Sequence, residues 1–155
     1  MSGKQRLSQW LPSPSINLNR GPNLVKFGST LSSVECAHIL VVGGGQQRQS
    51  LEATLAQYPN LRFIYTDIDI NATVDIFCDA HDLPFKDNIF HGAIITAVLE
   101  HVLYPERVVS EIHRVLVDGG VLYSEIPFMQ QVHEGAYDFT RYTLSGHRRL
   151  YKAVW

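Results

Sequence analysis

The sequence has little cysteine, no long apolar run and no acidic side chain in its first 34 residues. Cys36 and Cys78 are too few for a disulfide framework and share no metal-ligand spacing, so we expect a protein of the reducing cytoplasm. No apolar run approaches the roughly 18 residues that cross a bilayer, which predicts neither a transmembrane helix nor a membrane partner. Residues 1–34 also lack the apolar stretch of a secretory signal.

Acidic side chains are concentrated in the middle of the chain. All 15 of them fall within residues 35–138, together with only 5 of the 13 basic ones. An acidic centre disfavours a phosphate-rich partner there and tolerates a cationic ligand. The basic cluster at His147, Arg148, Arg149 and Lys152 is typical of a solvated helix face, so we do not expect nucleic acid as a partner.

The chain of 155 residues has the length of one domain. Residues 1–34 are rich in Ser, Asn, Pro and Gly without helical or strand periodicity. We interpret them as an irregular arm that wraps the domain, pinned by Trp10 and Phe27. Residues 35–155 then form the domain itself.

Short apolar runs alternate with helical patterns from residue 37 onward, which predicts an α/β fold with a doubly wound, mostly parallel sheet. Only six residues separate Asp67 from Val74, so a loop rather than a helix should lead to the third strand, at the sheet edge. The chain ends soon after its fifth strand, as in a sheet truncated there. That open edge could pair with a second copy to give a homodimer, or with another partner. The predicted strands are 39–42, 61–65, 74–78, 92–96 and 121–126, with helices over 51–58, from Pro105 to Gly119-Gly120, and after a Thr143 cap.

Candidate ligand-binding residues follow these strands, because open α/β sheets bind ligands at the carboxyl ends of their strands. Gly43, Gly44 and Gly45 follow the first strand, where glycine permits a sharp turn and close backbone approach. Asp67 follows the second strand and could accept both hydroxyls of a ribose, with Asp69 as a competitor.

The stretch from Asp79 to Phe128 carries the most specific pattern. It contains Asp-Ala-His-Asp-Leu-Pro-Phe from 79, Thr-Ala-Val-Leu-Glu-His from 96, Glu-Ile-His-Arg-Val-Leu from 111 and Ile-Pro-Phe from 126. In order and spacing, residues 37–128 closely resemble the small-molecule class I S-adenosylmethionine-dependent methyltransferases.

The resemblance implies S-adenosylmethionine as cofactor and a role for each matching residue. The glycines would lie against the methionine part, Asp67 with Ile68 at the ribose, and Asp79 at the adenine amino group. The further residues implied are Ala80 beside the adenine ring, Thr96 and Ala97 on the methionine side, and Glu100 and His101 facing the substrate pocket.

Three positions depart from the family pattern. Val41 stands where an acid usually precedes the first glycine by two residues, Gln47 where a further glycine is usual, and His91 where an Asp is common. The Val41 departure removes a group that helps to hold the amino end of the cofactor.

A second cluster follows the fifth strand: His133, Tyr137, Asp138, Phe139, Arg141, Tyr142 and Thr143. It resembles a segment of the methyltransferases linked to glycan or cell-surface polymer synthesis, which implies that Tyr137, Asp138 and Arg141 contact the substrate. The competing interpretation is structural, with Asp138 and Arg141 paired to fix a loop. By position, His101 is the first candidate for a catalytic base and His133 the second. The histidine spacings give no metal-ligand set.

The sequence therefore predicts methyl transfer to a small-molecule or glycan acceptor. The alternative is a catalytically inactive methyltransferase-like module for binding or assembly, motivated by Val41, Gln47 and the short C-terminus. A nicotinamide dinucleotide domain is disfavoured, because Arg48 stands where a close-packing Gly or Ala is needed.

Overall fold

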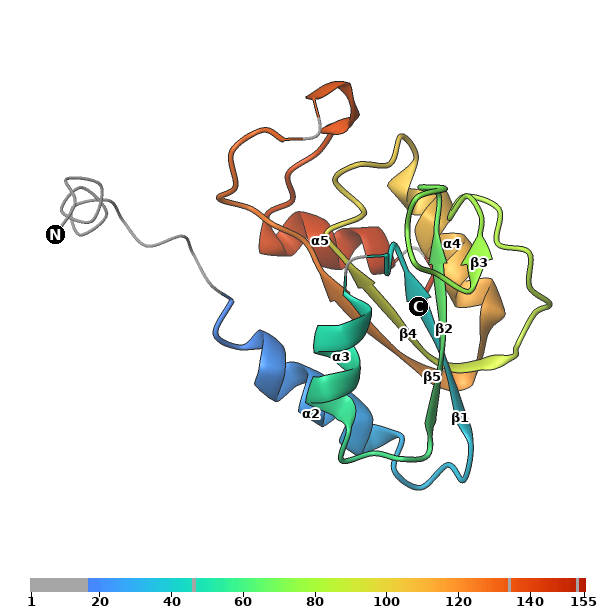
Figure 1. Ribbon diagram of the computed structural model, residues 1–155. Coiled ribbons are helices and arrows are strands. Elements are labelled where there is room, and N and C mark those ends of the chain that lie inside the picture. Colours follow the sequence, from blue (N-terminus) through green and yellow to red (C-terminus); the bar gives the residue numbers. More distant parts are fainter. Residues whose placement is uncertain (1–16, 46, 134, 153) are drawn as a thin grey trace, which may run out of the picture.

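A five-stranded parallel sheet organises the computed structural model, which describes residues 17–45, 47–133, 135–152 and 154–155 (Figure 1). Its strands lie in the order β3-β2-β1-β4-β5, and every neighbouring pair is parallel. The predicted α/β class and doubly wound sheet are confirmed. The strand bounds are β1 (Ala37–Val42), β2 (Leu61–Asp67), β3 (Ile76–Phe77), β4 (Phe90–Thr96) and β5 (Leu116–Glu125).

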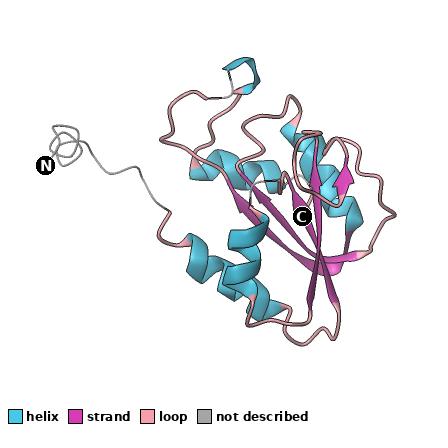
Figure 2. Ribbon diagram, in the orientation of Figure 1, coloured by secondary structure: helices cyan, strands magenta, loops and turns pink. Residues whose placement is uncertain are grey.

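Among the described residues, helices cover both faces of this sheet (Figure 2). On one face α2 (Arg20–Thr30) and α3 (Arg48–Leu55) pack against Ile39 and Val41 of β1. On the other, α4 (Pro105–Val115) and α5 (Leu144–Tyr151) belong to the core that includes Leu40 and Val42. Alternate residues of β1 thus enter opposite cores, which explains why its sequence is a continuous apolar run.

Helix α2 corrects the prediction of irregular structure for residues 20–30. Its Leu24 and Phe27, with Leu31 just beyond, are buried against the sheet, so Phe27 does pin this segment. The sequence does not predict this helix, because the glycine at 28 and the proline at 22 both have low helix propensity. Gly28 is required by packing, since a Cβ there would lie 2.4 Å from the Tyr58 ring. Trp10 lies outside the described residues.

Helix α4 ends four residues before the predicted glycine stop. Leu116 is already extended, with ψ of 140°, and β5 runs on through Gly119 and Gly120. The two glycines lie in an irregular part of strand β5 and do not cap the helix. The pairing of β4 with β5 shifts register between Phe90 and Gly92, and Gly119 adopts φ of +73°.

The two edges of the sheet differ. β3 is reached by a loop, as predicted, and pairs with β2 through two residues. The outer edge of β5 has no partner strand within the described part of the chain, so pairing there with a second copy stays a prediction.

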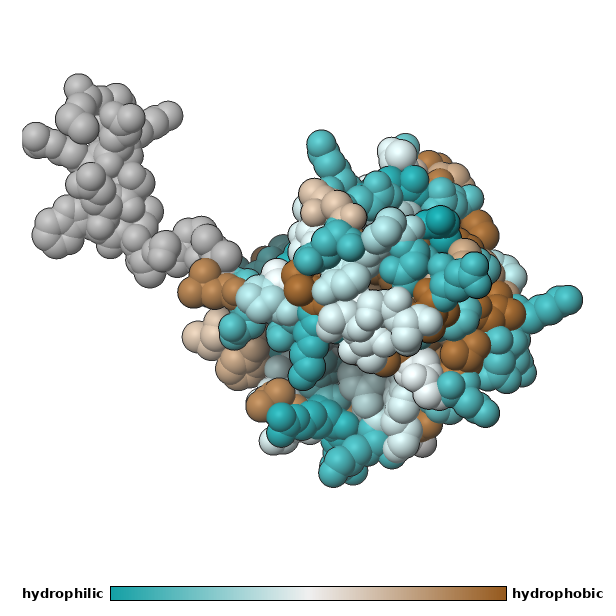
Figure 3. All heavy atoms as spheres, turned by 90° about the horizontal axis from the view of Figure 1, so that it is seen from below, coloured by the Kyte–Doolittle hydropathy of each residue, from teal (hydrophilic) through white to brown (hydrophobic). Residues whose placement is uncertain are grey.

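Hydrophilic residues prevail on the underside of the molecule, between separate hydrophobic groups (Figure 3). Of the helices described, none is long and apolar enough to cross a membrane.

One arginine clamps the segment before β4 onto α4. Arg114 donates to both Glu111 oxygens (2.8 and 2.7 Å), to Asp87 (2.7 Å) and to the carbonyls of Leu83 and Phe85. Glu111 in turn accepts from the Leu83 N–H at 2.9 Å. The hydrogen bonds from Arg114 hold the pKa of Glu111 below its ordinary value.

We expect Arg114→Ala to lower the free energy of unfolding by about 2 kcal/mol, because it leaves a mostly buried carboxylate without its charged partner. Arg107→Ala, an exposed position on the same helix, should change it by less than about 0.5 kcal/mol. A carboxylate with a lowered folded-state pKa stabilises the fold above its unfolded-state pKa of about 4.3 and loses this contribution as the pH falls. Urea unfolding at pH 7 and pH 3 checks both points: the Arg114 effect should shrink at pH 3, and an equal effect from Arg107 would refute the clamp.

Candidate functional site

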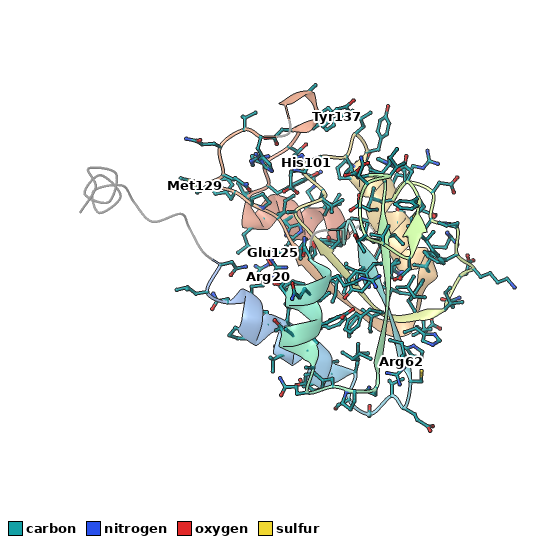
Figure 4. The ribbon with its side chains drawn as sticks, in the orientation of Figure 1. Arg20, Arg62, His101, Glu125, Met129 and Tyr137 are labelled. Atoms are coloured by element: carbon teal, nitrogen blue, oxygen red, sulfur yellow. The ribbon has the colours of Figure 1, made fainter. Side chains whose placement is uncertain are left out.

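A cavity of about 740 Å³ opens at the carboxyl ends of the strands. Figure 4 shows His101 and Tyr137 at this end of the molecule, with Arg62 at the opposite end. Loops that follow β1, β2, β3 and β4 surround the cavity, together with the segment after β5. The lining residues are Val42, Gly43, Gly45, Gln47, Thr66, Asp67, Ile68, Asp69, Asn71, Ala72, Thr73, Cys78, Asp79, Ala80, His81, Ala97, Val98, His101, Val102, Leu103, His133, Tyr137 and Phe139.

The glycine loop after β1 is shaped by close contacts with neighbouring loops. Gly43 has φ of +66°, and a Cβ there would lie 2.2 Å from a Val98 methyl group. A Cβ on Gly45 would lie 2.6 Å from the Cβ of Ala72. Any larger residue at these positions would clash with Val98 or Ala72, so glycine lets the loop pass close to its neighbours with its backbone exposed toward a ligand.

Three carboxylates, those of Asp67, Asp69 and Asp79, line the cavity, and backbone N–H groups orient each of them. Asp67 accepts from the Gly45 N–H at 3.1 Å and from the Asp69 N–H at 3.0 Å. Asp79 accepts from the His81 N–H at 2.9 Å, and this bond is the main cause of its lowered pKa. The competing Asp69 uses its own carboxylate to accept from Asn71. Asp67 and Asp79 therefore sit at separate, fixed points of the cavity wall.

Gln47 connects the glycine loop to α2 and β4. Its amide donates to the Thr96 carbonyl at 3.1 Å, and its carbonyl accepts from the Thr96 hydroxyl and, at 2.7 Å, from Arg20. Arg20 also lies 3.9 Å from Glu125 at the end of β5, and the two side chains are neighbours in Figure 4. A glutamine in place of the usual glycine thus forms a specific bridge between three elements.

The other departures are explained by packing. Val41 is buried with Tyr65 and Leu51 in the core beneath the glycine loop. His91 accepts from the His38 N–H at 3.2 Å across the β1–β4 pair. Neither side chain lines the cavity.

Two histidines and a buried glutamate meet at one end of the cavity. The Nε2 atoms of His101 and His133 are 3.1 Å apart, and Oε1 of Glu100 lies 3.8 Å from Nε2 of His101. Glu100 is fully buried, and neither of its carboxylate oxygens has a hydrogen-bond partner. Burial raises the pKa of Glu100, and its own backbone N–H, followed by the nearby His101, Arg141 and His133, opposes that rise.

Asp138 and Arg141 fix the segment that carries His133. Arg141 donates to both oxygens of Asp138, one of them at 2.7 Å, and Asp138 accepts from the His133 N–H at 2.8 Å. The Glu100 carbonyl accepts from the Phe139 N–H at 2.8 Å, which ties the segment to the turn after β4. The geometry matches the structural interpretation of this pair.

The structure brings most of the predicted site residues together. Gly43, Gly45, Asp67, Ile68, Asp79, Ala80, Ala97, His101, His133 and Tyr137 line the cavity. Five do not, each for a local reason: Gly44 packs onto Tyr65, Thr96 is bound by Gln47, Glu100 lies behind the imidazoles, and Asp138 and Arg141 bind each other.

Sequence reasoning missed the apolar wall formed by Ala72, Val98, Val102 and Leu103. Their position directly after strand ends was the available signal, because every such loop faces the same edge of the sheet.

The comparisons with known proteins decide the family. Residues 40–124 match the methyltransferase domain family, which is more than half of the chain. The chain belongs to the class I S-adenosylmethionine-dependent methyltransferases. S-adenosylmethionine is the usual cofactor of this family. The ubiquinone/menaquinone biosynthesis C-methyltransferase UbiE of Neisseria gonorrhoeae is 37% identical over 67 residues, which is 43% of this chain and 27% of that relative.

Solved methyltransferase structures have the same fold. The chain superposes with a TM-score of 0.65 on a structure from the complex of the Haloferax volcanii Trm112 methyltransferase activator with the putative methyltransferase, at 19% identity over 88% of this chain and 69% of that one. The TM-score is 0.66 for phosphoethanolamine N-methyltransferase 2 of Haemonchus contortus, solved in complex with S-adenosyl-L-methionine, at 15% identity over 88% of this chain and 36% of that one. At these identities the likeness concerns the fold.

Because Asp138 accepts hydrogen bonds from Arg141, we expect a low pKa for its carboxyl group. Hydrogen bonds from Arg141 lower the pKa of Asp138 to about 2. The pair should therefore persist above pH 4 and weaken as the pH falls through about 2. Carboxyl-carbon NMR titration should give this pKa in the native chain and a value near the ordinary 4 in Arg141→Ala. The same pKa in both chains would show that Arg141 does not hold this carboxylate.

Proposed function

We propose that this chain binds S-adenosylmethionine in the cavity and supports methyl transfer to a small-molecule or glycan acceptor. Family membership supports the cofactor, and the placement of Asp67 and Asp79 along one cavity carries the proposal. When bound, the cofactor supplies a methyl group on a positively charged sulfur. The protein's task is then to align the acceptor and exclude water.

The cavity wall has groups suited to each part of that cofactor. We assign Gly43, Gly44 and Gly45 to the methionine end, where the loop offers close backbone approach. Asp67, with Ile68 beside it, is assigned to the ribose hydroxyls, and Asp79 with Ala80 to the adenine. Ala97 borders the methionine side with φ of +54°, while Thr96 acts there indirectly through Gln47.

The histidine end of the cavity is assigned to the acceptor. Nδ1 of His101 lies 2.7 Å from the Tyr137 carbonyl, which can only accept, so Nδ1 carries a proton and Nε2 is free to accept one. A hydroxyl or amine acceptor would pass its proton to Nε2 of His101, with His133 beside it. Tyr137 and Phe139 form the apolar part of this wall, beside which a glycan or a small molecule could lie.

The comparisons give no support to a catalytically inactive module. Gln47 and Val41, the departures that motivated it, have their own contacts and leave the cavity open.

Calorimetric titration with S-adenosylhomocysteine tests the cofactor site. We expect binding by the native chain and at least a tenfold loss in Asp67→Ala, because hydrogen bonds to a charged group contribute about 1.5–3 kcal/mol each. Asp118→Ala, an exposed position on the opposite end of β5, is the matched control and should bind like the native chain. Absence of binding by a folded native chain would overturn the proposal.

The base role of His101 is tested once an acceptor is found by screening hydroxyl- and amine-bearing small molecules and glycans for S-adenosylhomocysteine release. His101→Ala should lower kcat by about 10²–10⁴-fold, the usual range for general-base catalysis. Full turnover by His101→Ala would exclude this role.

A further inference from the structure

The ring nitrogens of His101 and His133 face each other at the end of the cavity and could hold a positive charge between them. Nδ1 of His101 is protonated, because it faces the Tyr137 carbonyl. Nδ1 of His133 faces the Gln131 carbonyl at 3.2 Å and Asp138 at 3.5 Å, both acceptors, and Arg141 at 3.4 Å, which already donates to Asp138. With protons on both Nδ1 atoms, two Nε2 lone pairs face each other across 3.1 Å.

Glu100 adds a negative charge to the same point. Its oxygens are without a hydrogen-bond partner, although the side chain is fully buried. Burial of an unpaired carboxylate is strongly unfavourable, so a cation or a proton must compensate it. A proton shared by the two imidazoles would leave the nearest Glu100 oxygen 3.8 Å from its partner, beyond hydrogen-bond distance.

A metal ion would satisfy all three groups directly. One ligand atom from each of Glu100, His101 and His133 falls within 4.8 Å of the others. Ligands about 2.0–2.2 Å from a tetrahedral zinc ion lie about 3.3–3.6 Å apart. The separations of 3.1 and 3.8 Å bracket this value.

We propose that Glu100, His101 and His133 form a binding site for a divalent transition-metal ion, Zn²⁺ in the first instance, at the acceptor end of the cavity. Two imidazoles and one carboxylate are a ligand set of catalytic zinc sites, in which a fourth position stays open. Here both histidines line the cavity, so the open position faces it. The carbonyls at both Nδ1 atoms are the outer partners that orient metal-binding histidines.

The role of the ion rests on the proposed function, whereas its binding does not. An ion at this site occupies both Nε2 lone pairs, so in the metal-loaded chain neither imidazole can accept a proton. The ion would instead bind an acceptor oxygen and lower the pKa of its hydroxyl group, as zinc does for water. This selects hydroxyl acceptors, such as phenols or sugars, over amines that are protonated at neutral pH.

Titration of the chelator-treated full chain with ZnCl₂ tests the site. We expect one tight site in the native chain and a loss of more than about 100-fold in both Glu100→Gln and His133→Ala, because losing even an outer partner costs 10–100-fold. His113→Ala is the matched control: this exposed histidine of α4 contacts Trp155, away from the cavity, and its loss should leave zinc binding unchanged. Co²⁺ should give visible ligand-field absorption in the native and control chains alone.

Equal zinc binding by all four chains would place the ion on other histidines and overturn the proposal, as would no binding by the native chain. Should Glu100→Gln fail to fold, His133→Ala decides the result. Titration of the same proteins with S-adenosylhomocysteine separates the two proposals: zinc binding without S-adenosylhomocysteine binding would contradict the cofactor site alone, and the reverse would contradict the metal site alone.

Discussion

The buried pairing of β1 with β4 is the constraint on which the cavity depends. Both strands are buried almost throughout, and their registered pairs run from Ile39 and Gly92 to Val42 and Ile95. Gly92 allows this because a Cβ there would lie 2.7 Å from Phe27 of α2. Since the strands are parallel and in register, both end at the same level. The turn at Gly43 therefore meets Val98, and these two loops begin the cavity.

The end of the cavity that holds His101 and His133 depends on a second junction, the turn after β4. Glu100 holds the segment after β5 through its backbone carbonyl, which accepts from Phe139 and Thr140. The next residue, His101, binds the Tyr137 carbonyl with its ring. One short turn thus orders a long loop, and it does so beside the end of β4, whose position is fixed by the sheet.

The sequence predicted the parts of the molecule whose signal is local. The apolar run of β1, the turn at Gly43 and the face of α4 at Val108, Ile112 and Val115 are such signals, and each corresponds to an observed element. Helix α2 was missed because its stability comes from tertiary packing of Leu24 and Phe27, which overrides the low propensity of its glycines and proline. The prediction that helix α4 extends to Gly119-Gly120 was wrong, because glycines occur in irregular strands as well as at helix ends.

Sites built from distant segments lie beyond such reasoning. Asp67 could be placed, because its position at a strand end defines where it lies relative to Gly43. The meeting of His101 with His133 could not, since the two are 32 positions apart, with α4 and β5 between them, and no spacing rule applies. Likewise, the bridge from Gln47 to Arg20 and Thr96 joins three elements through one side chain. Gln47, which in the sequence is a departure from the usual glycine, connects three elements of the fold through its hydrogen bonds.

The two ends of the cavity differ in how their negative charge is compensated, and this difference defines what each can bind. At one end, N–H groups of the chain already bind the carboxylates of Asp67 and Asp79 and orient their remaining lone pairs toward neutral hydroxyl or amino groups of a ligand. At the other end, the Glu100 carboxylate has no hydrogen-bond partner, and Nε2 of His101 lies 3.8 Å from its Oε1. A neutral ligand cannot compensate a carboxylate and two lone pairs that converge on one point. A cation bound at this end, as we propose for Zn²⁺, would compensate that charge independently of any positive charge that a ligand brings to the rest of the cavity.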